Sequence, residues 1–254
     1  MYKKTADFEI ETTNKKPIEV AKAILNLSKN QMNTKICAVI TADKVEDALN
    51  DLKKLTSADL IELRLDFVRD IGKNGVKSLI ENLPKPVIVT CRAAKFGGLF
   101  KGNERDRLDL LKTAIDNGAS FVDVEFGSEI VSKIVTNTKS KIIISHHDFK
   151  ETLSLRNLNS LYKTMKKLNP ELIKIVTTAN SINDNFKIFQ LLREKNDLVA
   201  FCMRQKGEIS RILASKFGSR LTYASIAENK KSALGQITLE EMQDLYHVNL
   251  IHKN

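Results

Sequence analysis

The 254-residue sequence has no tryptophan, four prolines and three cysteines, and it has no long uninterrupted apolar run. Cys37, Cys91 and Cys202 are odd in number, form no Cys-x-x-Cys pair and fall within or at the end of short apolar runs. We therefore expect reduced core thiols rather than disulfides or a zinc site. A membrane helix needs roughly 18 apolar residues, and residues 1–9 lack the apolar segment of a signal peptide. These absences predict a cytoplasmic protein with no membrane segment and no bound metal.

Acidic residues are the minority among the charges: there are 41 Lys and Arg but 31 Asp and Glu, which leaves a formal net charge of +10. The excess is dispersed, because pairs such as Lys166-Lys167 and Lys230-Lys231 lie among acidic and apolar residues. A nucleic-acid surface usually has a basic stripe interleaved with aromatic residues, and this sequence has neither. We expect no nucleic-acid partner and a positive field that helps to attract an anionic small molecule.

After residue 34, short apolar runs alternate with amphipathic stretches, and several runs are apolar throughout, as in strands of a parallel sheet covered on both faces. The expected strands are residues 35–40, 60–65, 86–91, 121–126, 141–146, 171–176, 198–203 and 221–225. Residues 43–55, 103–114 and 181–193 have helical apolar spacing. Eight such units predict an α/β fold, a (β/α)8 TIM barrel over residues 35–254. The alternative, a doubly wound sheet, usually has a glycine-rich phosphate turn, which this sequence lacks.

Residues 1–34 stand outside this repeat and predict a short N-terminal extension without an assigned role. Within it, Phe8–Thr12 has the pattern of a strand, and Pro17–Leu27 has that of an amphipathic helix with proline near its start. At the other end of the chain, His247 and His252 are expected to be solvated residues of a terminal helix and tail.

Two residues suggest chemistry. Lys174 interrupts the apolar run Glu171–Val176, and His147 lies in a turn that ends the apolar run Lys141–Ser145. Removal of water disfavours a charged lysine, and a neutral amine attacks a ketone to form a Schiff base. A histidine at the end of a neighbouring strand can transfer the protons that such chemistry needs. From residue types alone, the alternative stays open that Lys174 points outward and His147 is an ordinary loop residue.

Seven motifs in order along the chain, from about residue 35 to about residue 245, resemble type I 3-dehydroquinate dehydratase. They are Glu62-Leu-Arg64-Leu-Asp66, Arg92 followed by Gly97-Gly98, Asp123-Val-Glu125, Ser145-His-His147-Asp-Phe149, Lys174, Gly207-Glu-Ile-Ser-Arg211 and Ser232-Ala-Leu-Gly-Gln236. Single motifs of this kind are weak, but seven at compatible spacing are specific.

The resemblance implies a barrel lyase of the shikimate pathway that converts 3-dehydroquinate to 3-dehydroshikimate without metal or cofactor, as a homodimer. By this resemblance Lys174 attacks the C3 ketone and forms an imine. His147 then takes a proton from C2 and delivers one to the departing C1 hydroxyl, with syn geometry. His146 is then the structural member of the histidine pair.

The resemblance also implies the substrate contacts. Arg211 matches the residue that binds the substrate carboxylate, for which its planar fork is suited. Glu62, Arg64 and Arg92 match residues that hold the substrate hydroxyls. Ser232 and Gln236 match a loop that closes over the substrate. Phe149 and Met203 match residues that pack against its ring.

Two positions depart from the family pattern. Phe96 stands where the family usually has a glutamate thought to tune the catalytic histidine, which leaves Asp123 and Glu125 as candidates for that role. Leu234 replaces the proline of the closing loop, which predicts a looser loop.

Other functions remain as alternatives. A class I aldolase or transaldolase also places an imine lysine in a (β/α)8 barrel, but usually with a phosphate site on the last loops. A catalytically weakened binding protein is a second alternative, suggested by Phe96. For Glu62 and Arg64, which share one face of a strand, a simple buried ion pair is the non-functional interpretation.

Overall fold

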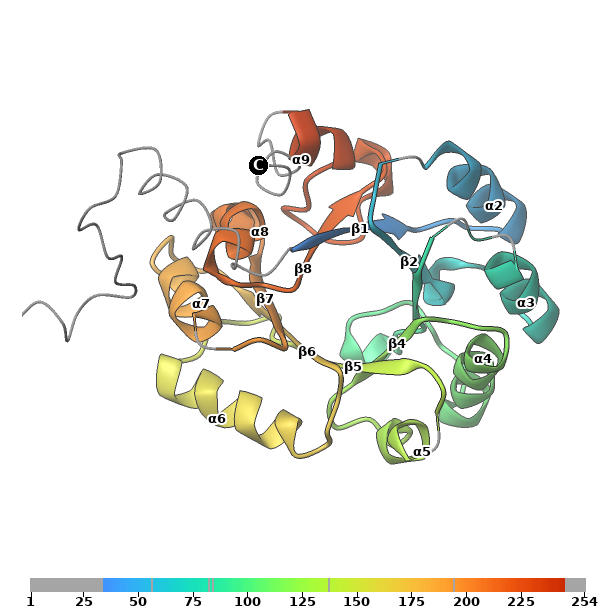
Figure 1. The fold of residues 1–254 in the computed structure, drawn as a ribbon, viewed down its shortest axis with the longest axis horizontal. Helices are drawn as coiled ribbons and strands as arrows, with labels where there is room; N and C mark the ends of the chain where they lie inside the picture. Colours follow the sequence, from blue (N-terminus) through green and yellow to red (C-terminus); the bar gives the residue numbers. More distant parts are fainter. Residues whose placement is uncertain are drawn as a thin grey trace, which may run out of the picture.

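The computed structural model describes residues 34–55, 57–81, 83, 85–136, 138–193 and 195–244. Its centre is one sheet of eight parallel strands, seen end-on in Figure 1. The strands are β1 (Lys35–Ile40), β2 (Leu60–Arg64), β3 (Val87–Thr90), β4 (Phe121–Glu125), β5 (Lys141–His147), β6 (Leu172–Thr178), β7 (Leu198–Met203) and β8 (Leu221–Ser225). All eight expected strands are confirmed, with ends that differ by at most two residues.

The strands follow the order β7-β6-β5-β4-β3-β2-β1-β8, so the chain winds round the axis and β8 returns to pair with β1. Between β7 and β8 the described residues form no ladder, but the Arg220 N–H donates to the Leu198 carbonyl at 3.0 Å. The sheet is therefore a nearly closed barrel, and the predicted fold class is confirmed.

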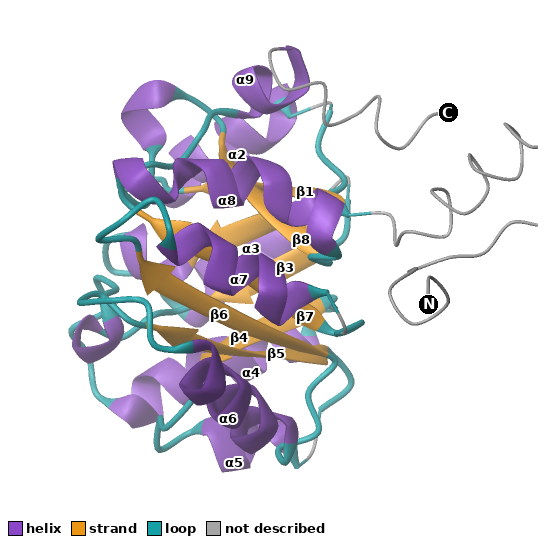
Figure 2. Ribbon diagram, turned by 90° about the vertical axis from the view of Figure 1, so that its left-hand side faces the viewer, coloured by secondary structure: helices purple, strands orange, loops and turns teal. Residues whose placement is uncertain are grey.

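Helices lie outside the barrel (Figures 1 and 2). The α-helices are α2 (Val45–Lys54), α3 (Lys73–Glu81), α4 (Glu104–Asp116), α5 (Val131–Val135), α6 (Leu155–Lys166), α7 (Asp184–Leu192), α8 (Glu208–Leu213) and α9 (Leu239–Asp244). Short 3-10 helices are η2 (Leu65–Phe67), η3 (Ala94–Phe96), η4 (Gln205–Gly207), η5 (Ala214–Phe217) and η6 (Glu228–Lys230). All three expected helices are present.

Local hydrogen bonds explain where two of these helices begin. The Asn103 side chain accepts the N–H of Asp106, which caps the first turn of α4 at the expected place. Helix α7 begins three residues later than expected, because the Asp184 carboxylate accepts the N–H groups of Asn180 and Ser181 and so stabilises a turn before it.

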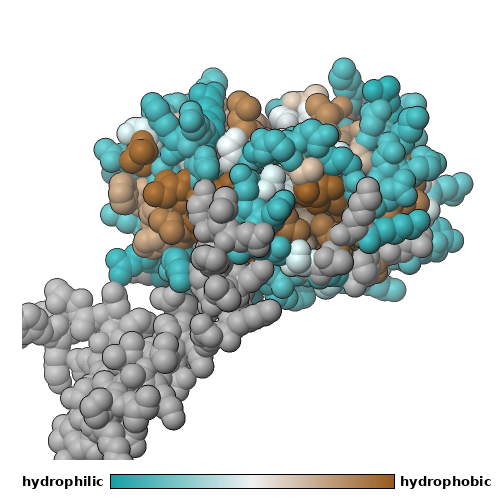
Figure 3. All heavy atoms as spheres, turned by 90° about the horizontal axis from the view of Figure 1, so that it is seen from above, coloured by the Kyte–Doolittle hydropathy of each residue, from teal (hydrophilic) through white to brown (hydrophobic). Residues whose placement is uncertain are grey.

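Two apolar layers hold the barrel together. Outward-facing strand residues such as Ile36 and Ile144 pack against the helices, while inward-facing residues such as Val39, Ile143 and Phe201 fill the barrel. The three cysteines are buried and free, as expected. The outer surface is mainly hydrophilic on the face seen in Figure 3. None of the helices in the described ranges combines the length and apolar character that a membrane crossing requires.

The elements expected at Phe8–Thr12 and Pro17–Leu27, and the positions of His247 and His252, lie outside the described residues.

Candidate active site

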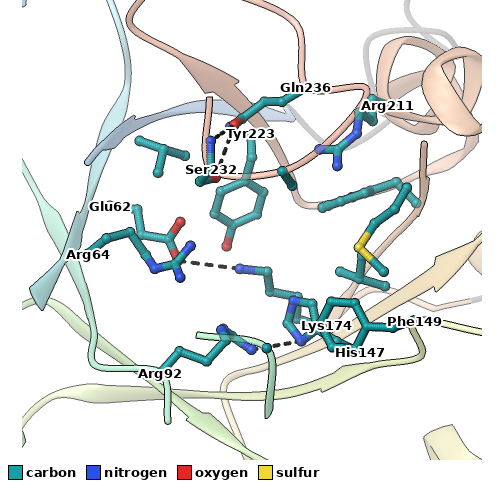
Figure 4. Close-up of a pocket in the computed structure, with 16 residues that line it drawn as sticks. Glu62, Arg64, Arg92, His147, Phe149, Lys174, Arg211, Tyr223, Ser232 and Gln236 are labelled. Carbon is teal, nitrogen blue, oxygen red and sulfur yellow. Dashed lines mark hydrogen bonds and ion pairs between the residues drawn. The ribbon is translucent and has the colours of Figure 1, made fainter. Parts of the chain in front are cut away.

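A pocket of about 530 Å³ lies inside the sheet, toward the C-terminal ends of the strands. All ten residues proposed from the sequence line it: Glu62, Arg64, Arg92, His147, Phe149, Lys174, Met203, Arg211, Ser232 and Gln236. Figure 4 shows most of them directed toward a common space. Six further residues complete the lining: Val39, Gly97, Val176, Phe201, Tyr223 and Ala233.

Lys174 points into the barrel, so the outward orientation considered as an alternative is wrong. Its side chain is 5% exposed, and its Nζ lies 3.4 Å from Glu62 Oε1 and 3.2 Å from Asp123 Oδ2. The nitrogen also lies over the Tyr223 ring, 4.0 Å from the centroid. The apolar neighbours of Lys174 that the sequence indicated are the adjacent residues of its own strand, β6. The two carboxylates come from β2 and β4, distant in the chain.

His147 lies on the same side of the sheet as Lys174. Strand β5 is one residue longer than expected and includes His147, and its Ser145 is in register with Lys174 of β6. Because side chains alternate along a strand, Ser145 and His147 face the pocket while His146 projects from the other face. The structure therefore places the two histidines on opposite faces of the sheet, and their expected roles stay predictions.

Arg92 contacts the ring of His147. Its Nη1 lies 2.7 Å from His147 Nδ1, and a guanidinium can only donate. Nδ1 is therefore the acceptor, and Nε2 carries the proton of the neutral ring. Burial first, and then the charges of Arg92 and Lys174, hold the pKa of His147 well below its usual value. The imidazole is neutral in the free pocket.

Asp123 joins these residues into one network. This fully buried carboxylate accepts hydrogen bonds from Arg92 Nη2 at 3.0 Å and Ser145 Oγ at 2.6 Å, besides its contact with Lys174. Burial alone would raise its pKa, but Lys174 and Arg92 outweigh burial and lower it. Of the two carboxylates considered as substitutes for the family glutamate, Asp123 therefore reaches His147 indirectly, through Arg92.

Glu125, the other candidate, turns away from the network. Its Oε2 lies 2.5 Å from Nη1 of the buried Arg107, which also donates to the Cys91 carbonyl. Phe96 is not part of the pocket lining, and its ring lies 5.3 Å from the Lys95 ammonium. The position of the family glutamate thus contributes no contact to His147 in this protein.

Glu62 and Arg64 do not form the ion pair with each other that was considered as an alternative. Arg64 makes two hydrogen bonds to Asp66, at 2.9 and 2.8 Å. Glu62 Oε1 accepts from Thr90 Oγ1 at 2.8 Å and contacts Lys174. Both side chains are therefore held in position at the pocket wall by other partners.

Arg211 is a buried cation without a counter-ion among the described residues. It comes from α8, its guanidinium lies 4.5 Å from the centroid of the Phe201 ring, and its Nε has no hydrogen-bond partner. Burial lowers its pKa to about 10, so it remains charged near neutral pH. A positive charge that is desolvated and unpaired is suited to receive a carboxylate.

The loop that carries Ser232 and Gln236 covers part of the pocket. Gln236 Oε1 accepts from the Ser232 N–H at 2.8 Å and from its hydroxyl at 3.0 Å. The Arg204 N–H donates to the Leu234 carbonyl at 3.1 Å. Gly235 has φ +74°, and a Cβ there would lie 2.5 Å from the Arg204 carbonyl oxygen, so this loop conformation requires glycine.

An aromatic side chain forms another part of the rim. Phe149 is 46% exposed, and its ring stacks on His147 with 6.1 Å between centroids. A Cβ at Gly97 would lie 2.1 Å from the Phe149 ring, so the glycine leaves room for it. Met203 lines the pocket from the end of β7.

Comparison with known proteins identifies the family. A sequence model of type I 3-dehydroquinase matches residues 36–253. The chain belongs to this family. A 3-dehydroquinate dehydratase of Dehalococcoides mccartyi is 38% identical over 218 residues, which cover 84% of this chain and 95% of the relative. One from Pyrococcus abyssi is also 38% identical, over 211 residues, covering 82% and 95%.

Solved structures of type I 3-dehydroquinases also match the fold. The type I 3-dehydroquinate dehydratase of Clostridium difficile with covalently modified comenic acid has a TM-score of 0.78 and 27% identity, covering 87% of this chain and 93% of that one. The Aquifex aeolicus 3-dehydroquinate dehydratase has a TM-score of 0.72 and 27% identity, covering 84% and 98%. A hexulose-phosphate synthase of Salmonella typhimurium, 13% identical, has a TM-score of 0.57 and covers 86% and 100%, and this likeness shows the fold alone.

The resemblance inferred from the seven motifs is thus confirmed, and these matches do not support the aldolase alternative. The residue roles that the type I 3-dehydroquinase pattern implies stay predictions. Sequence reasoning missed Tyr223 as a pocket residue, although it is an inward-facing position of an expected strand. It also missed the contact of Lys174 with two carboxylates, because no local pattern encodes it.

Proposed function

We propose that this protein dehydrates 3-dehydroquinate to 3-dehydroshikimate through an imine on Lys174, with His147 as the proton-transfer residue. One observation carries the proposal: Lys174 and a neutral His147 face the same pocket as Arg211, a buried cation that has no counter-ion among the described residues. The names of the relatives supply the substrate, a small anionic ketone.

Binding begins with charge. Arg211 offers two parallel N–H donors to the substrate carboxylate, and the loop with Ser232 and Gln236 closes above it. Glu62, Arg64 and Arg92 surround the opposite side of the pocket and bind the substrate hydroxyls. These contacts direct the C3 carbonyl toward Lys174 Nζ, so that the reacting atoms meet in a fixed orientation.

Imine formation then activates the substrate. Lys174 loses a proton and its nitrogen attacks C3. The carbonyl oxygen takes up that proton and a second one from the nitrogen and leaves as water, so that the nitrogen keeps one proton in the imine. The protonated imine withdraws electrons from C2 and acidifies the C2 proton. The carboxylates of Glu62 and Asp123, which contact Nζ in the free enzyme, stabilise positive charge on the same nitrogen.

His147 needs a change of tautomer before it can act as a base at Nε2. In the free pocket Arg92 donates to Nδ1, which leaves the ring proton on Nε2. Binding of a substrate hydroxyl by Arg92 releases Nδ1, and the ring can then hold its proton there and accept one at Nε2. Substrate binding and activation of the base are thereby linked through Arg92.

Elimination and release complete the cycle. His147 Nε2 takes the C2 proton, the electrons form the C1–C2 double bond, and His147 returns the proton to the C1 hydroxyl, which leaves as water from the same face. One water molecule hydrolyses the imine, replacing the water lost in its formation, and Lys174 is regenerated. The net reaction releases one water.

Absorbance of the conjugated enone product provides the direct test. Purified protein mixed with 3-dehydroquinate should produce this absorbance, and borohydride added during turnover should leave a reduced adduct on the peptide that contains Lys174. No absorbance change, or an adduct on a different lysine, would contradict the proposal. Sugar phosphates serve as control substrates and should give neither product nor adduct.

A further inference from the structure

Tyr223 is a pocket residue to which no role has been assigned so far. It lies in β8 and is only 3% exposed, at a level where its register partner in β1 is Cys37. The ring faces Lys174, with the Nζ 4.0 Å from its centroid (Figure 4). Tyr223 therefore contacts the nitrogen that is proposed to react.

The contacts of this nitrogen change character during the reaction. The ammonium has three N–H donors and lies near two carboxylates, Glu62 and Asp123. After imine formation the nitrogen is bonded to two carbons and keeps one N–H, so it can no longer donate to both carboxylates as before. Attraction to an aromatic face depends on the positive charge and needs no hydrogen. The Tyr223 ring can thus stabilise the nitrogen in both of its charged forms, the ammonium and the protonated imine.

The hydroxyl of Tyr223 has a separate property. It is buried and has no hydrogen-bond partner among the described residues, although it belongs to a side chain that lines the pocket. Burial raises its pKa well above the usual value, so it stays protonated and available as a donor. Buried polar groups in proteins are normally paired, so an unpaired one facing a pocket points to a polar atom of the ligand.

We propose that Tyr223 is a further catalytic residue, whose ring stabilises the positive Lys174 nitrogen in the imine and whose hydroxyl donates to an oxygen of the bound substrate. This role rests on the proposed imine mechanism. The ring and the hydroxyl of Tyr223 can be tested separately, because different substitutions remove them.

Tyr223→Phe tests the hydroxyl. It keeps the ring, and it should raise KM for 3-dehydroquinate about three- to tenfold, the effect of one lost hydrogen bond, while kcat changes little. The melting temperature should stay the same or rise, because the hydroxyl has no protein partner. An unchanged KM would overturn the role of the hydroxyl.

Tyr223→Leu tests the ring. It should lower kcat about tenfold below that of Tyr223→Phe, and reduce the fraction of Lys174 that borohydride traps at saturating 3-dehydroquinate. The leucine variant can also disturb packing. We therefore add a series in which residue 223 is phenylalanine carrying one, two or three fluorine atoms on its ring, so that the size and shape of the side chain change little. Fluorine weakens the negative face of the ring, so kcat should fall stepwise. A flat series would overturn the role of the ring.

Tyr162→Phe is the matched control. The Tyr162 hydroxyl donates to Asp197 at 2.7 Å, outside the pocket. Its loss should lower the melting temperature and leave kcat and KM unchanged. Wild-type protein that gives neither turnover nor adduct would overturn the imine mechanism, and the role of Tyr223 with it. Active wild-type protein with a flat fluorine series and an unchanged KM in Tyr223→Phe would overturn the role of Tyr223 alone.

Discussion

At the scale of single residues, the register of β5 and β6 separates two adjacent histidines. His147 faces the pocket beside Arg92, whereas His146 projects from the other face of the same strand. The difference between them follows from the alternation of side chains along a strand and not from their chemistry.

His147→Ala should lower kcat about 10²- to 10⁴-fold, the usual contribution of a general acid–base group. Slow imine formation should persist, because Lys174 remains, and borohydride trapping followed by mass spectrometry would detect it. His146→Ala is the control and should leave kcat nearly unchanged while reducing stability by about 1 kcal/mol. Equal loss of activity in both variants would mean that the proton-transfer residue is misassigned.

Lys174 is held by charge as well as by packing, which changes what its removal should do. The apolar run around Lys174 in the sequence favoured a neutral amine. The structure instead places its Nζ within 3.4 Å of Glu62 and 3.2 Å of Asp123, both buried. Asp123 keeps Arg92 as a partner, but Glu62 keeps only the Thr90 hydroxyl among its hydrogen bonds to described residues.

Lys174→Met should therefore lower the free energy of unfolding at pH 7 by about 3–5 kcal/mol, since removal of one member of a buried ion pair leaves the other uncompensated. Combining it with Glu62→Gln should restore most of that stability, because no carboxylate then lacks its cation. Urea unfolding of both variants would measure this. A double variant no more stable than Lys174→Met would show that the cost comes from packing.

At the scale of elements, the closing loop after β8 contains two adjacent residues with different constraints, Leu234 and Gly235. Gly235 must be glycine, while Leu234 is 77% exposed and contributes its carbonyl to the Arg204 N–H. The Leu234 N–H donates no hydrogen bond to another described residue. Proline at this position would therefore break no backbone hydrogen bond to a described residue.

Leu234→Pro should stabilise the closed loop by restricting its open conformations. Substitutions of this kind contribute about 0.4–1 kcal/mol, which corresponds to a KM lower by about two- to fivefold if closure accompanies binding. Steady-state kinetics with 3-dehydroquinate would measure the effect. Leu234→Ala removes the side chain without fixing φ and is expected to leave KM unchanged; a similar fall in both variants would point to the side chain instead.

At the scale of the whole molecule, burial of His147 links stability to pH. Its pKa in the folded protein is well below the usual value, while a histidine in the unfolded chain is half protonated near pH 6.5. Well above that pH the ring is neutral in both states, and the effect on stability vanishes. Below pH about 6.5 the unfolded chain binds the additional proton, and stability falls as the pH falls toward the folded-state pKa. The lowered pKa of Asp123 acts only below about pH 3.8 and does not overlap this range.

We expect the free energy of unfolding to decrease between pH 6.5 and 5 with a slope that approaches about 1.4 kcal/mol per pH unit from His147. In His147→Asn that slope should be smaller, whatever the stability of the variant at pH 7.5. Urea titrations across this range would measure both slopes. The same slope in both proteins would show that other groups cause the pH dependence. His146 is one of them, because burial also lowers its pKa.

The sequence by itself determined the fold class, the family and the members of the site. Period-two and near-continuous apolar runs predicted all eight strands, because the burial of both faces of a parallel sheet is encoded locally. Motifs within or after these strands named Lys174, His147 and Arg211, and in a barrel the C-terminal ends of the strands converge on one pocket.

Only the tertiary structure decided which of these residues contact one another. The pairing of Lys174 with Glu62 and Asp123, of Arg92 with His147 and of Glu125 with Arg107 joins different strands and helices. These distances depend on strand register and on the curvature of the sheet, to which residues far apart in the chain contribute. The protonation of His147 and the role of Tyr223 follow from those contacts, so they became visible only once the barrel had brought their partners together.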